Sequence, residues 1–533
     1  MMQNMLKITK EQEILWATKP VRDSSFTFTI EGTVKEPDSI YSKSILAHHA
    51  GVEKNSYNNG PAFAPEWGYS FTHLGGQKDG MGRTIEAGYS VPPKTRKEAL
   101  EVIRAFLMKQ YIKDAPHPWI SMNGHYPWHH YAGEFGFDML CSEIGENINN
   151  YQWHIALNRG AAKQYQLPWS IDFSAWYGPS VTDYSEQKHW KEYSSPDGGH
   201  TMSLLERSYY MAYMAGAGEV VAESGRIISF YDDTDEAGIR TLSPYGQVGK
   251  SFYDFTCSNP DRGICYVPFG VVLDYYHGAY SGFDGKKAFY HFHYNKGDEM
   301  TWNLINMIWP GGWEVQGHNE IGTMVNGPYG DNYDILLQNA PEELLKTYPC
   351  LILSGAIRFK KKEVEKFERY VKQGGTLLLN RAYLKYFLLF ADMDENADII
   401  EAPFGNGTVV IYGNNYEIDG IEVILSDRIK KLIPVSIAGN VQYMVNVCKD
   451  RLLLTLINND GVTKDYLAPP EIDSKQVISF SVTYTGIEQI KQMTDLKSGR
   501  VYTAHDNKIN ITMEPGSVAV LEIKSKASGE SLQ

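Results

Sequence analysis

Two successive strand–helix steps with polar residues at the strand ends constrain the fold of this chain most. Residues 137–141 form a short apolar run that is followed by Glu143 and Glu146. A helix is predicted over 151–164, and a second buried strand over 169–173. Such steps are typical of a (β/α) barrel, where catalytic groups lie at the carboxyl ends of the strands. An open α/β sheet also binds ligands beyond its strand ends, so the chemistry is expected here in either fold.

Length and charge limit the function classes. The 533 residues provide for about three domains, and the net charge of −14 argues against nucleic acid as a partner. No run of eighteen apolar residues predicts a membrane span. No signal peptide is visible at the N-terminus, so a cytoplasmic protein and an exported one whose signal was removed both stay open. The five cysteines form no C-x-x-C pair, and we predict no cofactor.

The aromatic residues are unevenly distributed. All eleven tryptophans lie at or before Trp313, and fourteen of the fifteen histidines lie at or before His318. Flat aromatic faces suit the C–H faces of sugars, although a large barrel also packs many aromatic side chains. The site is therefore predicted in the first three hundred residues.

A third strand, predicted over 119–122, ends in the polar segment NGHYPWHHY, which offers Asn123 and His125 as ligands for a polar substrate. His125, His129 and His130 have a spacing found in some metal sites. Pro127 interrupts the segment, which is not the two-turn helix that this spacing needs, so no metal is predicted.

The candidate catalytic pair is Glu143 and Glu223, because both follow an apolar strand and precede a glycine. Hydrolysis of a glycosidic bond needs one carboxyl group that protonates the leaving oxygen and a second that attacks or activates water. The alternative is that either glutamate is the buried partner of an arginine such as Arg159 or Arg207.

Further side chains near these strand ends are candidates for binding a substrate. Glu146 is the rival of Glu143, although at a helix N-terminus it is also explained as a cap. Asp172 either orients a sugar hydroxyl or satisfies an arginine, and Trp176 with Tyr177 is a candidate stacking platform. The Asn319-Glu320 dipeptide is interpreted as a chance match to a glycosidase motif, or as part of a loop over the cleft.

The fold class predicted for the chain is α/β, with three domains. Residues 1–255 are expected to form a (β/α) TIM-type barrel, and 256–390 a doubly wound α/β domain. The latter resembles the class I glutamine amidotransferase fold, but the strand over 351–353 leads into Ser354-Gly355-Ala356 without a cysteine nucleophile. Residues 391–533 alternate in short segments such as GTVVIYG and LLLTLINNDG, which predicts a β-sandwich.

This order of domains resembles the family 42 β-galactosidases and related glycoside hydrolases. The segments LSPYGQVGKSFYDF, VPFGVVLDYYHG and YDILLQNAPEELLKTYPCLILSGAIRFKKKEVEKFERYVKQGGTLLLN carry the resemblance, which covers roughly residues 240–525. It implies two catalytic glutamates in the barrel and a homo-oligomer, a dimer or a trimer, formed through the middle domain. The family pair lies three strands apart, whereas Glu143 and Glu223 are predicted two strands apart.

The sequence therefore predicts a glycoside hydrolase that acts on a carbohydrate with Glu143 and Glu223 in unassigned order. The alternative is a carbohydrate-binding protein that keeps the fold without catalysis. An amidotransferase is disfavoured because the cysteine is missing.

Overall fold

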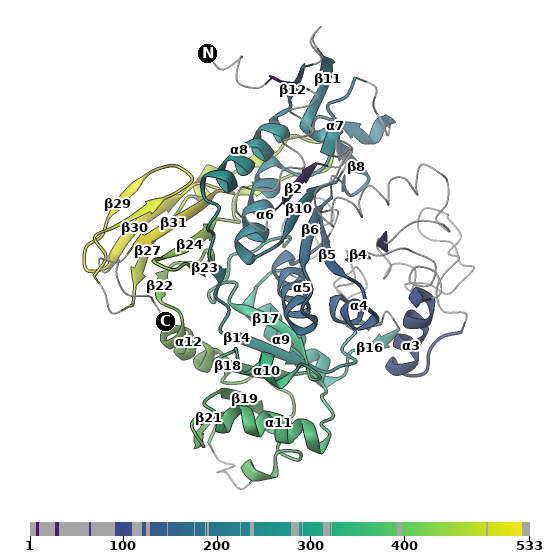
Figure 1. Cartoon of the computed structure of the whole chain (residues 1–533), viewed down its shortest axis with the longest axis vertical. Helices are drawn as coiled ribbons and strands as arrows, with labels where there is room; N and C mark the ends of the chain where they lie inside the picture. Colours follow the sequence, from purple (N-terminus) through teal and green to yellow (C-terminus); the bar gives the residue numbers. More distant parts are fainter. Residues whose placement is uncertain are drawn as a thin grey trace.

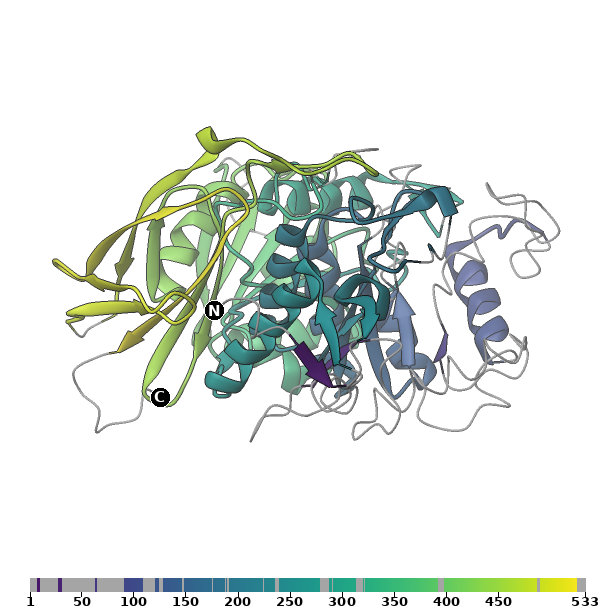
Figure 2. The same ribbon diagram turned by 90° about the horizontal axis from the view of Figure 1, so that it is seen from above.

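The computed structural model describes most of the chain, with several gaps before residue 128. The described ranges are 7–9, 27–30, 63–64, 91–108, 120–123, 128–145, 148–174, 176–186, 188, 191–223, 225–234, 239–278, 287–289, 291–312, 320, 322–391, 397–486 and 489–524. Figure 1 shows three parts: a parallel sheet with its helices in the middle, an α/β domain below it, and a β-sandwich to one side. Helix α3 lies at the end opposite the sandwich (Figure 2).

Six parallel strands form the sheet of the first part. Their order across the sheet is β2 (Thr27–Ile30), β10 (Glu219–Ala222), β6 (Trp169–Phe173), β5 (Met139–Ile144), β4 (Ile120–Asn123) and β3 (Phe63–Ala64). The first of these strands along the chain, β2, pairs with the last, β10. This cyclic order is that of a barrel, but no described strand joins β2 to β3. The closed eight-stranded barrel therefore stays a prediction.

Helices connect these strands, and all of them after the first pack against one face of the sheet. They are α3 (Arg96–Leu107), α4 (His129–Phe135), α5 (Tyr151–Tyr165) and α6 (Met202–Ala215). The side chains of Asn150 and Thr201 accept hydrogen bonds from backbone N–H groups in the first turns of α5 and α6, which fixes where these helices begin. Ser142 on β5 contacts His129 Nε2 at 3.2 Å, so the even-numbered residues of β5 face the helices.

Short elements complete the first part. They are β1 (Lys7–Thr9), β7 (Trp176–Tyr177), β8 (Ser180–Thr182), η4 (Lys191–Tyr193), β9 (Ser194–Ser195), α7 (Gly225–Ser229), β11 (Phe230–Thr234), β12 (Ile239–Leu242) and α8 (Pro244–Ser258). Strands β7, β8 and β9 form a small sheet of their own directly after β6.

The α/β domain is doubly wound. Its sheet has the order β17 (Tyr333–Leu337), β14 (Phe269–Leu273), β18 (Cys350–Ser354), β19 (Thr376–Asn380), β21 (Gly407–Tyr412) and β20 (Ile400–Phe404), and only β20 is antiparallel. Its helical and minor elements are β15 (Lys287–Ala288), β16 (Phe292–His293), α9 (Lys296–Ile308), α10 (Glu342–Leu345), α11 (Lys361–Lys372), η5 (Arg381–Tyr383), η6 (Leu388–Phe390) and α12 (Ile421–Leu432). The chain runs first to β14, then to β17 on one side of it and β18 on the other, so the order reverses between β14 and β18.

The β-sandwich consists of two antiparallel sheets. One contains β13 (Ile264–Cys265), β23 (Gln442–Val447), β24 (Arg451–Ile457), β31 (Val518–Lys524), β28 (Gln492–Asp495) and β29 (Val501–Thr503). The other contains β22 (Val435–Ala438), β27 (Ile478–Tyr484) and β30 (Lys508–Met513). Minor elements are β25 (Val462–Thr463), β26 (Glu471–Ile472) and η7 (Ser474–Gln476).

One strand assignment made from the sequence was wrong. The segment GTVVIYG was expected in the sandwich, but its strand β21 pairs in parallel with β19 of the α/β sheet. Its alternating side chains do not distinguish a sandwich strand from one near the edge of an α/β sheet. We therefore propose that the boundary between the second and third domains lies after Tyr412 rather than at 390.

The first part and the α/β domain share a core. Helix α5 packs on the edge strand β17, and a Cβ added at Gly160 would lie 1.9 Å from the backbone oxygen of Ile335. Next to this contact Arg159 Nε lies 2.5 Å from Asp334 Oδ1, and both side chains are buried. None of the described helices combines the length and the apolar character that crossing a membrane requires.

Candidate functional site

Carboxylates stand side by side at the carboxyl ends of β5 and β6. Glu143 is opposite Asp172 in the parallel register, and each of the two residues is only 7% exposed. Glu223 follows β10 directly, and its backbone N–H donates to the carbonyl of Phe173 at 3.0 Å. The structure therefore brings three of the predicted site residues to the ends of three adjacent strands.

These carboxylates lie on the face of the sheet that points away from the helices. Ser142 faces the helices, so the neighbouring residues Cys141 and Glu143 face the other side. Burial raises the pKa of the Cys141 thiol well above its usual value, and the charges of Asp172, Glu219 and Glu143 raise it further. The inner face of the sheet is thus acidic, and the fully buried Glu219 contributes to it.

The register limits the distances between the candidate catalytic groups. Neighbouring strands lie about 4.8 Å apart, so Asp172 is one strand spacing from Glu143. Glu223 follows a strand that is two spacings, roughly 9.6 Å, from β5. Glu143 and Glu223 therefore lie two strands apart, as expected from the sequence, with Asp172 between them.

The two aromatic candidates differ in their surroundings. Trp176 is half-buried and packs at the edge of the core. Tyr177 is buried, and its ring lies 4.7 Å from that of His200 at an angle of 30°. Tyr177 therefore presents almost no ring surface for stacking in this structure, so Trp176 is the better candidate for a platform.

Glu320 has a role that the sequence did not indicate. It is buried and accepts hydrogen bonds from Thr201 N at 2.7 Å and Thr201 Oγ1 at 2.8 Å, and it contacts His200 Nδ1 at 2.9 Å. Burial by itself would raise the pKa of Glu320, but the hydrogen bonds and charges, His200 first among them, outweigh burial and lower the pKa. This carboxylate therefore ties its segment to the first turn of α6.

The alternative partners considered for the catalytic pair are engaged elsewhere. Arg159 binds Asp334 and donates to the carbonyl of Tyr333 at 2.9 Å. Arg207 donates to Asn459 Oδ1 at 2.6 Å. Neither arginine forms an ion pair with Glu143 or Glu223 within the described part of the chain. Arg159 and Arg207 are therefore not the buried partners that the sequence offered for these two glutamates.

The histidines after β4 have structural contacts. His129 and His130 begin helix α4, which was not predicted, and both are buried. His130 Nε2 lies 2.9 Å from the carbonyl of Ile335, and burial lowers the pKa of His130 to about 3. Among the residues that the structure describes, no group of three or more His, Cys, Asp and Glu side chains is arranged to hold a metal ion.

Three residues predicted to bind the substrate lie wholly or partly outside the described part of the chain. His125 and Glu146 lie outside the described residues. Asn123 is the last residue of β4 and pairs with Ser142, which puts its backbone beside the end of β5, but its side chain lies outside the described part.

Comparison with known proteins finds similarity in structure alone. No protein-family model and no curated protein sequence matches the chain. A β-galactosidase from Bacillus circulans sp. alkalophilus aligns with a TM-score of 0.46 and 11% identity over 80% of this chain and 66% of that one. A GH42 β-galactosidase from G. stearothermophilus aligns with a TM-score of 0.47 and 11% identity, over 84% of this chain and 71% of that one.

An α-L-fucosidase from Paenibacillus thiaminolyticus aligns with a TM-score of 0.43 and 13% identity, over 81% of this chain and 71% of that one. These proteins are glycoside hydrolases, the class of enzyme that the sequence resembles. Because every one of these TM-scores is below 0.5, the alignments carry no argument about the chemistry of this chain. The proposals below rest on the geometry of its own residues.

Proposed function

We propose that this chain is a glycoside hydrolase whose catalytic carboxylates are Glu143 and Glu223. The observation that supports the proposal is the gathering of Glu143, Asp172 and the backbone of Glu223 at the carboxyl ends of three adjacent parallel strands. One carboxyl group protonates the glycosidic oxygen as the bond to the sugar breaks. The other attacks the anomeric carbon or activates the water that does so.

Asp172 is the third member of this site. It lies between the strands of the two glutamates and within one strand spacing of Glu143. In this position it accepts a hydrogen bond from a sugar hydroxyl and orients the ring between the catalytic pair. Trp176 supplies the stacking surface, while Asn123, His125, Glu146 and Tyr177 stay predictions for binding the same substrate, as does the homo-oligomer that the resemblance implies.

The replacement of each glutamate by glutamine tests the proposal. The wild-type chain is first screened against aryl glycosides and a panel of glycans. Glu143→Gln and Glu223→Gln are each expected to lower kcat by about 10²–10⁴-fold, because the amide neither gives up a proton nor attacks.

Glu299→Gln is the matched control, because Glu299 is exposed on α9 in another domain. Near-normal turnover in either active-site variant would remove that residue from the mechanism. Tight binding of a glycan by calorimetry without any product would instead identify a carbohydrate-binding protein.

A further inference from the structure

One polar residue interrupts the apolar layer between the helices and the strands β5 and β6. The other residues of these strands that face the helices are buried and hydrophobic: Leu140, Ile144, Trp169, Ile171 and Phe173. Ser142 lies among them and is fully buried. It directly precedes Glu143, one of the two proposed catalytic groups. A buried hydroxyl costs free energy unless it is hydrogen-bonded, so its partners matter.

Two helices supply the partners of this hydroxyl. Asn158, in the middle of α5, donates from Nδ2 to Ser142 Oγ at 3.0 Å. His129, the first residue of α4, has its Nε2 at 3.2 Å from the same oxygen. Burial lowers the pKa of His129 well below its ordinary value, and the nearby His154 and His130 lower it further. The imidazole is therefore neutral, and a neutral ring nitrogen is able to accept the hydrogen of the Ser142 hydroxyl.

The amide of Asn158 also reaches the neighbouring strand. Its Nδ2 donates to the carbonyl of Ser170 on β6 at 3.1 Å, so one side chain bridges β5 and β6. The bridge lies one residue before Glu143 on β5 and two residues before Asp172 on β6. It therefore supports the two strands where their carboxylates begin, from the opposite face of the sheet.

Stability alone does not explain an asparagine at this position. Asparagine is a poorer helix former than leucine, and apolar side chains of the same shape generally replace a buried hydrogen-bonded pair at little cost. The Oδ1 atom of Asn158 is buried and has no hydrogen-bond partner among the described residues. Asn158 is thus unfavourable both for the helix and for the core, which points to a role outside folding.

We propose that Asn158, together with His129, is a positioning residue that sets the direction of the Glu143 carboxylate relative to Asp172. The peptide unit between Ser142 and Glu143 is planar, and successive side chains of a strand point to opposite faces. Holding the Ser142 hydroxyl on the helix side therefore fixes how the Glu143 side chain leaves the other side. This inference rests on the proposed function, since Asn158 acts through Glu143 and contacts no substrate.

Replacement of Asn158 by leucine keeps the number of side-chain heavy atoms and removes both hydrogen bonds. On a glycoside that the wild type hydrolyses, kcat should fall about 10–100-fold, because a displacement of about 1 Å in a catalytic group costs on the order of 10²-fold. The KM should change less than about twofold, since Asn158 lies on the face of the sheet away from the substrate. The melting temperature should stay the same or rise.

Ser142→Ala is the second variant, and it removes a single atom, so it is expected to fold. It should lower kcat by a factor similar to that of Asn158→Leu. The double variant should lose no more than either single one, because both replacements remove the same hydrogen bond. Full multiplication of the two losses would contradict action through Ser142.

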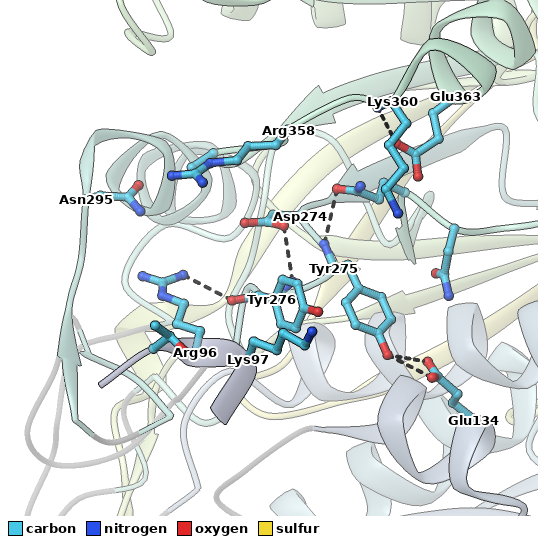
Figure 3. A pocket seen from close by; sticks show the side chains of 14 residues that line it. Arg96, Lys97, Glu134, Asp274, Tyr275, Tyr276, Asn295, Arg358, Lys360 and Glu363 are labelled. Carbon is cyan, nitrogen blue, oxygen red and sulfur yellow. Dashed lines mark hydrogen bonds between the residues drawn. The ribbon is translucent and has the colours of Figure 1, made fainter. Parts of the chain in front are cut away.

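Two control variants remove other hydrogen bonds made by the same helices. Gln164 on α5 accepts from Leu337 N at 3.0 Å and donates to Asn339 Oδ1 at 2.9 Å, and Gln164→Met removes both bonds. Tyr275→Phe removes the hydroxyl that donates to Glu134 of α4 at 2.7 and 2.8 Å (Figure 3). Both controls should lower the melting temperature and leave kcat within about twofold of wild type.

Crystal structures of the wild type and Asn158→Leu give a measurement that needs no substrate. The Glu143 carboxyl group should move relative to that of Asp172 by more than about 0.5 Å, the tolerance within which catalytic groups are held. Carboxyl groups that stay in place, an unchanged kcat, or equal losses of kcat in the controls would overturn the positioning role. A wild type without glycosidase activity, or a fully active Glu143→Gln, would instead overturn the proposed function, and the two crystal structures would still decide whether Asn158 positions Glu143.

Discussion

At the scale of single residues, the same side-chain type has different roles because its surroundings differ. Glu320 and Glu143 are both buried glutamates. Glu320 is held by Thr201 and His200, which favours its charged form and fixes it as a structural anchor. Glu143 lies opposite a second carboxylate, Asp172, at the ends of two paired strands, and we propose it as a catalytic group.

Replacement of Glu320 by glutamine should therefore destabilise the protein. We expect a loss of about 2 kcal/mol in the free energy of unfolding at pH 7, since hydrogen bonds to a charged group are worth about 1.5–3 kcal/mol. The folded-state pKa of Glu320 is lowered, so its contribution is present above the unfolded pKa of about 4.3 and is lost as the pH falls through the lower folded value. The gap between wild type and Glu320→Gln should shrink below about pH 4 in urea titrations. A gap that is constant with pH, or one no larger than that of Glu299→Gln, would contradict the anchoring role.

At the scale of elements, the contact between α5 and β17 determines how the first part meets the α/β domain. Gly160 is the residue of closest approach, because any side chain there would collide with the backbone of Ile335. A helix interior ordinarily prefers alanine to glycine by about 1 kcal/mol. The glycine is therefore explained by the tertiary contact and not by the helix.

Gly160→Ala is accordingly expected to destabilise the chain by about 3 kcal/mol, although it improves the intrinsic helix propensity. Gly136→Ala is the matched control: Gly136 has φ of 94° at the end of α4, and an added Cβ there has nothing within 4 Å. That variant should lose only about 1 kcal/mol, from backbone strain alone. Thermal and urea unfolding measure both. Equal losses of stability in the two variants would contradict the prediction, because they would show that α5 can move away from β17 at little cost.

At the scale of the whole molecule, a buried charge network connects two domains. Asp334 on β17 accepts from Arg159 Nε at 2.5 Å and Lys163 Nζ at 2.6 Å, both on α5, and from Tyr348 OH at 2.8 Å. Burial by itself would raise the pKa of Asp334, but the charges of Arg159 and Lys163 outweigh it and lower the pKa. The stabilisation is present above the unfolded pKa of about 3.9 and is lost as the pH falls through the folded value.

Asp334→Asn should leave Arg159 charged and buried without a counter-ion. The expected cost is about 3–5 kcal/mol near neutral pH, and the two domains should no longer unfold in a single transition. Calorimetry at pH 7 and pH 3 measures the stability and the number of unfolding transitions. The loss of stability relative to wild type should be smaller at pH 3. Asp427→Asn, which removes an exposed pair with Lys431, should cost less than about 1 kcal/mol. A single unshifted transition in Asp334→Asn would contradict the coupling of the domains.

The sequence by itself determined those features that depend on neighbours along the chain. The pattern of apolar residues located the helix predicted over 151–164 and the strand predicted over 169–173, which are α5 and β6. Polar residues after apolar strands identified Glu143 and Glu223 as candidates. These signals are readable because a cap, a turn or a strand end involves only a few consecutive residues.

Only the tertiary structure decided which distant residues meet. The pairing of Glu320 with His200 spans 120 positions, and the pairing of Arg159 with Asp334 spans 175. The strand register that places Glu143 opposite Asp172, and the pairing of β21 with β19 rather than with the sandwich, likewise depend on packing. The physical reason is that such contacts form only when the chain closes long loops against conformational entropy, and local sequence patterns carry no information on which closure the packed core favours.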